Sequence, residues 1–179
     1  IAKAYGFDLT NQDLESFRGL IAPMLESYNR LDQFPDPTPP VMYSRDIGHP
    51  PRPEDNTSGA WYWRSEIRGS EKGPLSGKTV AIKDNVSVAG VPMMNGSKVL
   101  EGYVPDTDAT LVTRILDAGG TILGKAVCES LCVSGGSHTS DTGPVRNPYD
   151  PSRSAGGSSS GSAALIALGE VDMAIGGDQ

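Results

Sequence analysis

The sequence has little of what several large classes of protein depend on. It contains only two cysteines and two histidines among 179 residues. Cys128 and Cys132 are too few for a disulfide framework, and with two distant histidines they do not form a zinc-binding pattern. No apolar run is long enough to cross a membrane, and no signal-peptide pattern opens the chain. We therefore expect a cytoplasmic protein in a reducing setting that does not insert into membranes.

The chain also lacks the basic surface that nucleic-acid binding requires. Lysine and arginine number 15 against 22 aspartates and glutamates, which gives a net charge of -7. No basic cluster compensates locally, so we expect no nucleic-acid partner. The hydrophobic content of 37% with charges of both signs is typical of a globular protein rather than a disordered one.

Composition changes twice along the chain and predicts two domains, residues 1–73 and 74–179. The first 34 residues have the apolar spacing of an amphipathic helix that begins at Thr10 or Asn11 and ends before Pro35. That helix either packs on a core or forms a helical extension that packs on a partner subunit. The rest of the first domain is rich in proline, which predicts an irregular linker held to the body by the aromatic side chains of residues 61–63.

Residues 74–179 alternate short apolar strands with helices. The expected strands are residues 79–82, 121–123 and 173–176. The expected helices are residues 109–118, capped by Asp108, and residues 160–168. This alternation predicts an α/β fold with a mixed, mostly parallel sheet covered by helices.

A Gly/Ser-rich loop from Gly156 to Gly161 carries the strongest chemical signal. Such a loop can direct backbone N–H groups and hydroxyls to one point. It is not a flexible linker, because the apolar residues 163–168 follow at once and a linker would not bury them. A Walker phosphate loop would need a lysine directly after its second glycine, and none is present.

Two further features can contribute to the same chemistry. Lys83 closes an apolar strand, where the simplest interpretation is a side chain that turns to water. If it is buried instead, desolvation disfavours the charged form, and a neutral amine can act as a general base for a hydroxyl. The strand at residues 173–176 runs into Gly177-Asp178-Gln179, and the N–H groups of such a turn can form an oxyanion hole.

In their order and spacing, these pieces resemble the amidase-signature family of serine amidases. The matching parts are Ile82-Lys83-Asp84, Asn147-Pro148-Tyr149-Asp150, Arg153, Gly156-Gly157-Ser158-Ser159 and Gly176-Gly177-Asp178-Gln179. The resemblance covers about residues 75–179. It implies the amidase-signature α/β fold and the hydrolysis of a small carboxylic amide to an acid and ammonia. A Ser-cisSer-Lys triad and an acyl-enzyme would carry this reaction without a metal or organic cofactor.

The resemblance also implies a role for particular residues. Lys83 is similar to the catalytic lysine of the family, and Ser158 to the bridging serine that follows a cis peptide bond. Gln179 begins the turn whose N–H groups form the oxyanion hole. Cys132, through main-chain atoms, and Ser134, through its hydroxyl, are implied in substrate binding. The nucleophilic serine would be the third residue beyond Gln179, so this segment alone is expected to be inactive.

Several positions depart from the usual family pattern and suggest a particular branch. Ser160 stands where glycine is usual, Ala126-Val127 where Thr-Asn is common, and Gly177 where threonine is usual. The segment from Cys128 to Cys132 and the Gly-Gly-Asp-Gln run are similar to bacterial amidases found with nitrile hydratases. In that branch the amino-terminal helices dimerise the enzyme, which implies a homodimer. Two alternatives stay open: a glutamine-hydrolysing amidotransferase subunit of the same family, and an inactive fragment or binding module.

Overall fold

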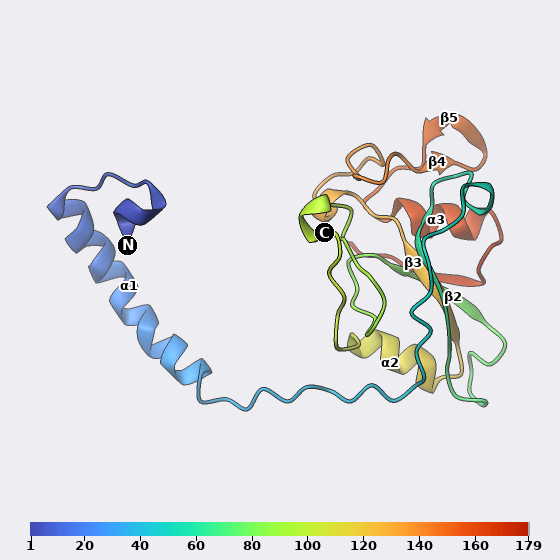
Figure 1. Ribbon diagram of the computed structural model, residues 1–179, viewed down its shortest axis with the longest axis horizontal. Coiled ribbons are helices and arrows are strands. Elements are labelled where there is room, and N and C mark those ends of the chain that lie inside the picture. The colour runs from blue at the N-terminus through green and yellow to red at the C-terminus, as the bar shows by residue number, and fades with distance from the viewer. Residues whose placement is uncertain (179) are drawn as a thin grey trace. The chain divides into compact units, whose positions relative to one another are not determined.

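A computed structural model describes residues 1–178, which divide into two compact units at Thr38 and Pro39 (Figure 1). The first unit holds a short 3-10 helix, Ala2–Tyr5, and the long helix α1, Asn11–Leu31. The second unit holds the sheet and all other elements. The domain division expected at residues 73 and 74 stays a prediction.

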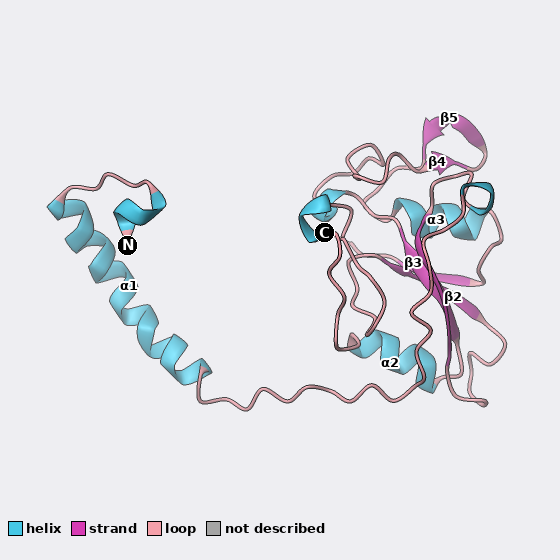
Figure 2. Cartoon of the chain, in the orientation of Figure 1, coloured by secondary structure: helices cyan, strands magenta, loops and turns pink. Residues whose placement is uncertain are grey.

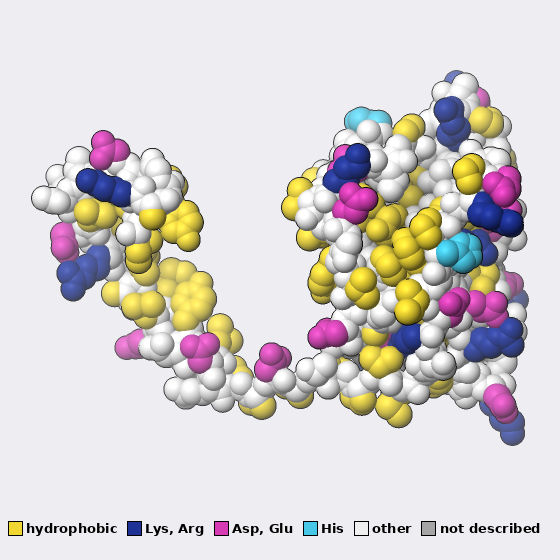
Figure 3. All heavy atoms as spheres, in the orientation of Figure 1, with side chains coloured by type: hydrophobic (Ala, Val, Ile, Leu, Met, Phe, Trp, Pro, Cys, Tyr) yellow, Lys and Arg dark blue, Asp and Glu magenta, His cyan; other side chains and the backbone are white. Residues whose placement is uncertain are grey.

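Helix α1 begins and ends as its sequence predicts. Thr10 is the N-cap: its hydroxyl accepts from the Asp13 N–H at 3.2 Å, and the Asp13 carboxylate accepts from the Thr10 N–H at 3.0 Å. No residue of α1 is buried. Its exposed apolar side chains, which Figure 3 shows gathered along the helix, are Leu14, Phe17, Leu20, Ile21, Met24, Leu25, Tyr28 and Leu31. Within the described part of the chain, no helix has the length and hydrophobicity to cross a membrane.

The sheet of the second unit is mixed and mostly parallel, as predicted (Figure 2). Its strands lie in the order β1-β3-β2-β6. Strand β1 is antiparallel to β3, whereas β3, β2 and β6 run parallel. Their bounds are Trp61–Arg68 for β1, Thr79–Lys83 for β2, Thr121–Ala126 for β3 and Met173–Ile175 for β6.

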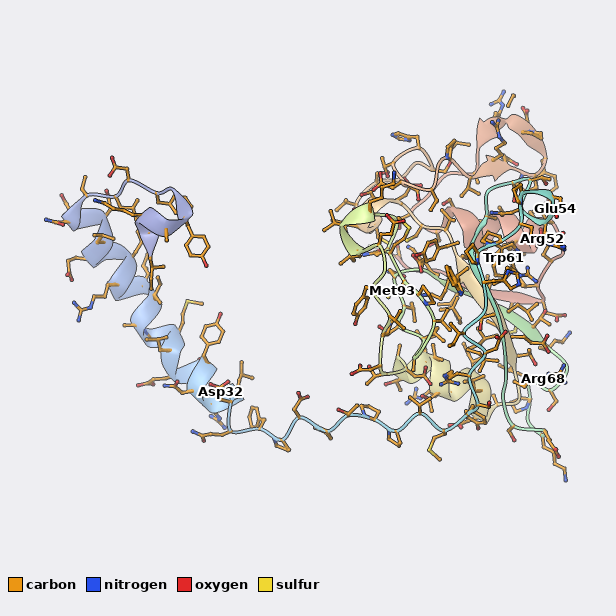
Figure 4. All side chains as sticks on the ribbon, viewed as in Figure 1. Asp32, Arg52, Glu54, Trp61, Arg68 and Met93 are labelled. Carbon is orange, nitrogen blue, oxygen red and sulfur yellow. The ribbon has the colours of Figure 1, made fainter. Side chains whose placement is uncertain are left out.

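Strand β1 corrects the expectation that the whole proline-rich zone is irregular. It lies beyond Pro53, so proline does not interrupt its pairing with β3. Trp61, labelled in Figure 4, is 2% exposed, and its Nε1–H donates to Glu170 Oε2 at 2.6 Å. The tryptophan therefore anchors this part of the chain to the body, as the aromatic cluster predicted.

Helices α2 and α3 cover opposite faces of the sheet. Helix α2, Thr110–Asp117, packs with Val80 and Ile82, while α3, Ser160–Ala167, packs with Ala81. Because successive residues of a strand face opposite sides, these contacts place the two helices on different faces. Strand β2 therefore lies between two hydrophobic clusters, one on each face of the sheet.

Asp108 does not cap α2, which corrects another expectation. The N-cap is Ala109, without a side-chain cap. The Asp108 carboxylate instead accepts from the Ala89 N–H at 2.8 Å and pairs with Arg45, so it ties the loop after β2 to the segment before β1. The remaining elements are the 3-10 helices Pro53–Asp55, Lys98–Leu100 and Ser130–Cys132, and a hairpin of β4, Arg146–Asn147, with β5, Asp150–Ser154.

Candidate active site

Strand β2 places Lys83 against the Gly/Ser-rich loop. The Lys83 side chain is fully buried, and its Nζ lies 2.8 Å from Ser158 Oγ. Ser158 follows a cis peptide bond from Gly157, immediately before α3. Lys83 therefore does not turn to water, and two predicted site residues 75 positions apart in the sequence are in direct contact.

The turn after β6 lies against this pair. Gly177 N–H donates to Ser159 Oγ at 3.0 Å, and the Ser159 hydroxyl donates back to the Gly177 carbonyl at 3.2 Å. A Cβ atom on Gly177 would lie 3.4 Å from Lys83 Nζ. The glycine turn thus approaches the Lys83 amine closely. Gln179, predicted to begin the oxyanion hole, lies outside the described residues.

Cys132 and Ser134, the predicted substrate-binding residues, both contact Glu129. The Cys132 N–H donates to the Glu129 carbonyl at 2.9 Å, and the Ser134 hydroxyl donates to Glu129 Oε2 at 3.1 Å. No hydrogen bond is seen from either residue to Lys83 within the described part of the chain. Their connection to the Lys83–Ser158 pair runs through Glu129, whose N–H donates to the Ser158 carbonyl at 3.2 Å.

The two cysteines share one acceptor and are not disulfide-bonded. The Cys132 thiol lies 3.3 Å, and the Cys128 thiol 3.5 Å, from Asn95 Oδ1. Burial, with a smaller contribution from Cys132, raises the pKa of the Cys128 thiol well above its ordinary value. A thiol held protonated in this way is a poor nucleophile. Both cysteines are buried, so their side chains contribute to packing.

A buried ion pair beside Lys83 was missed by the sequence analysis. Lys125 Nζ lies 3.1 Å from Asp84 Oδ1, with the two side chains 0% and 1% exposed, although the groups are not aligned as a hydrogen bond. The other Asp84 oxygen accepts from the N–H groups of Met94 at 3.0 Å and Asn95 at 2.8 Å. A signal was available, because Lys125 interrupts the apolar run of residues 122–127.

Burial dominates the electrostatics of this pair. It raises the pKa of Asp84 and lowers the pKa of Lys125, and the charge of each partner partly offsets the shift of the other. The pair connects the end of β2, strand β3 and the loop at residues 94–95. It therefore fixes the strand end that carries Lys83.

Glu129 is the second functional candidate that sequence reasoning missed. Its side chain is fully buried, and it contacts Ser158, Cys132 and Ser134 through separate atoms. The signal was weak, because an acidic residue between two cysteines carries no mark of burial. Only the fold shows that this residue is buried and contacts three of the predicted site residues.

The chain is similar to known proteins over most of its length. The family model described as Amidase matches residues 52–179. The chain is 52% identical to an enantioselective amidase from Rhodococcus rhodochrous, over 96% of this chain and 34% of that protein. It is 49% identical to a glutamyl-tRNA(Gln) amidotransferase subunit from Methanosarcina acetivorans, over 63% of this chain and 24% of that protein.

Solved structures share the fold over more than half of the chain. The peptide amidase from Stenotrophomonas maltophilia matches with a TM-score of 0.53 and 39% identity, over 57% of this chain and 22% of that one. The glutamyl-tRNA(Gln) amidotransferase subunit from Thermotoga maritima matches with a TM-score of 0.57 and 36% identity, over 64% and 25% of the two chains. The present chain thus spans about a third or less of the length of each of these relatives.

Proposed function

The chain belongs to the amidase family, and on that basis we propose that it is part of an enzyme that hydrolyses carboxylic amides to carboxylic acids and ammonia. The observation that carries the proposal is the 2.8 Å contact between the buried Lys83 amine and the Ser158 hydroxyl. A buried amine beside a hydroxyl is the arrangement that activates a serine without a histidine. By the complete enzyme we mean this chain together with the residues expected after Gln179.

The proposed reaction moves protons along one path. The Lys83 amine takes a proton from Ser158, which takes one from the nucleophilic serine expected beyond Gln179. That serine attacks the amide carbon, and N–H groups of the turn expected to begin at Gln179 stabilise the oxyanion. The Lys83 ammonium returns its proton to Ser158, which protonates the leaving amide nitrogen so that ammonia departs. Water then attacks the acyl-enzyme, and a proton taken from that water returns along the same path to the nucleophilic serine as the carboxylic acid leaves. The 2.8 Å distance between Lys83 Nζ and Ser158 Oγ is short enough for the first transfer.

Coverage of the relatives favours a linear-amide hydrolase over an amidotransferase subunit. The similarity to the Rhodococcus enantioselective amidase extends over 96% of the chain, whereas that to the Methanosarcina amidotransferase subunit covers 63%. A match over 96% of the chain must include most of the first unit, residues 1–38. We therefore propose the branch of bacterial amidases found with nitrile hydratases, whose substrates would be the amides formed from nitriles.

An amide-hydrolysis assay tests this function directly. We expect the complete enzyme to release acid and ammonia in equal amounts from a simple carboxylic amide. Added hydroxylamine should divert part of the product to the hydroxamate, because an acyl-enzyme can be captured by a competing nucleophile. Residues 1–179 alone should show no turnover, since the expected nucleophile lies beyond them.

Each other outcome of the assay has a distinct meaning. Hydrolysis of glutamine alone, and only with partner subunits present, would favour the amidotransferase subunit. If the complete enzyme hydrolyses no amide, the proposed function is contradicted. Turnover by residues 1–179 alone would show that the nucleophile has been placed wrongly.

The exposed apolar face of α1 supports a homodimer. Phe17 and Ile21, one helical turn apart, are 49% and 52% exposed, and a contiguous apolar face of this kind is typical of an interface. We expect Phe17→Glu with Ile21→Glu to convert a dimer of the complete enzyme to a monomer in analytical ultracentrifugation. Asn29→Glu, which adds charge elsewhere on the same helix, should leave the dimer intact. A monomeric wild type would contradict this proposal.

We also propose a cytoplasmic location. Cys128 and Cys132 are free and buried, which suits a reducing compartment. Recovery of the enzyme from the periplasm or the medium after cell fractionation would contradict it.

A further inference from the structure

Glu129 contacts three of the predicted site residues with three different atoms. Its N–H donates to the Ser158 carbonyl at 3.2 Å, and its carbonyl accepts from the Cys132 N–H at 2.9 Å. Its Oε2 accepts from the Ser134 hydroxyl at 3.1 Å. The residue thus connects the serine expected to relay protons with the segment expected to bind substrate.

The Glu129 carboxylate also holds the loop of residues 134–139. Besides the Ser134 hydroxyl, Oε2 accepts from the Thr139 N–H at 3.2 Å and from the Thr139 hydroxyl through a short hydrogen bond. Hydrogen bonds to a carboxylate are charge-assisted and are therefore stronger than hydrogen bonds between neutral groups. Three of them end on this one oxygen. Both ends of the loop, Ser134 and Thr139, are therefore bound to the same carboxylate oxygen.

The same side chain packs against the residue before Ser158. A Cβ atom on Gly157 would lie 2.8 Å from Glu129 Cγ and 3.0 Å from Oε1. Oε1 is buried and has no hydrogen-bond partner among the described residues, so it faces Gly157 without competing contacts. The carboxylate therefore fills the space next to the Gly157 backbone and limits where Ser158 can lie.

We propose that Glu129 is a positioning residue that sets the distance between Ser158 and the substrate-binding segment at Cys132 and Ser134. This inference rests on the amidase function proposed above. Glu129 would keep the Ser158 hydroxyl, which relays the proton, correctly placed relative to the bound amide. Misplacement by about 1 Å can cost on the order of a hundredfold in rate, so a displaced loop has a measurable effect.

Two changes to the complete enzyme test the proposal. Glu129→Met keeps a side chain of similar length but removes both carboxylate oxygens, and we expect kcat/KM to fall about 100-fold. Thr139→Val removes the hydroxyl, which donates to Glu129 and also accepts from the Ser130 N–H at 3.3 Å, and it should lower kcat/KM about tenfold. Thr139→Ser keeps the hydroxyl and should stay within about twofold of wild type. The valine and serine variants form a matched pair, because serine rescues the hydrogen bond with an even smaller side chain.

A control separates positioning from general destabilisation. Glu170→Met removes the acceptor of the Trp61 indole N–H at the far end of α3, so it lowers stability without touching the site. If Glu170→Met lowers the unfolding temperature as much as Thr139→Val does, it should still keep kcat/KM within about twofold of wild type. If Glu170→Met loses as much activity as Thr139→Val, or if Thr139→Val keeps wild-type kcat/KM, Glu129 is not a positioning residue.

Hydrogen exchange gives a readout that does not need turnover. We expect the amides of residues 134–139 to exchange faster in Thr139→Val than in Thr139→Ser, because the loop is less firmly held. Equal exchange in the two variants would overturn the inference. An inactive wild type with the expected difference in exchange would instead overturn only the proposed amidase function.

Discussion

Replacing Lys83 by methionine in the complete enzyme is expected to lower kcat for amide hydrolysis by at least about 10³-fold. Methionine keeps the length and bulk of the lysine stem but provides no proton acceptor. Lys83 is fully buried, and its Nζ lies 2.8 Å from Ser158 Oγ, so solvent water has no ready access to replace it. Every proton that leaves the expected nucleophile passes through Ser158 to this amine in the proposed path. Steady-state ammonia release near neutral pH measures the effect.

Lys78→Met is the matched control at the other end of β2. Lys78 is 53% exposed, and its Nζ pairs with Asp172 Oδ1 at 3.1 Å, away from Ser158. Its removal should leave kcat within about twofold, because an exposed ion pair contributes little to stability. Adding Ser158→Ala to Lys83→Met should cause little further loss, since residues that act in one proton path are not additive. A Lys83→Met enzyme that retains more than about a tenth of wild-type kcat would contradict the proposed role of the lysine.

The elements predicted correctly are those whose signals are local. Helix α1 has a long apolar period and a capping residue at Thr10, and both act within one or two turns. Strand β2 is a short β-branched run that ends in a charged residue. Strand β1 mixes polar and apolar residues, and its pairing with β3 joins positions about 60 apart in the sequence. The β-propensity of a segment does not indicate a pairing partner that is distant in the sequence, so β1 was assigned to an irregular zone.

Some residues of the candidate site were proposed from the sequence, and others were missed. Lys83 was proposed as a candidate because it ends an apolar strand, and Ser158 because its loop resembles the Gly-Gly-Ser-Ser segment of the amidase-signature family. Glu129 and Lys125 were missed because their significance lies in burial, and a charged residue in a sequence is ordinarily exposed. Their partners are set by the tertiary fold: Glu129 contacts Ser158, and Lys125 contacts Asp84 across neighbouring strands. Residue pattern and family resemblance therefore supplied the candidate residues Lys83 and Ser158, whereas the fold was needed to find the buried charged residues that contact the same segments.

Replacing Lys125 by methionine is expected to lower the free energy of unfolding by about 3–5 kcal/mol. The side chains of Lys125 and Asp84 are 0% and 1% exposed, so the change leaves the Asp84 carboxylate buried without a counter-charge. Methionine fills the space of the lysine stem, which limits the contribution from a cavity. Urea denaturation of the protein at neutral pH measures the change. Lys78→Met, which breaks the half-exposed pair with Asp172, should cost less than about 1 kcal/mol.

The pH dependence of this destabilisation identifies its cause. Burial already raises the pKa of Asp84 above its ordinary value of 3.8, and loss of the Lys125 ammonium should raise it further. An acid with a raised folded-state pKa binds its proton more readily in the folded chain than in the unfolded one. The difference in stability between variant and wild type should therefore be largest above the raised pKa and shrink as the pH falls toward 3.8.

A double variant completes the test. Asp84→Asn keeps an amide oxygen that can accept from the N–H groups of Met94 and Asn95, but it removes the charge. Combined with Lys125→Met, it should therefore be more stable than Lys125→Met alone, because no uncompensated charge remains buried. A double variant that is less stable than Lys125→Met, or a destabilisation that does not change with pH, would show that packing rather than the buried charge at the end of β2 determines the loss.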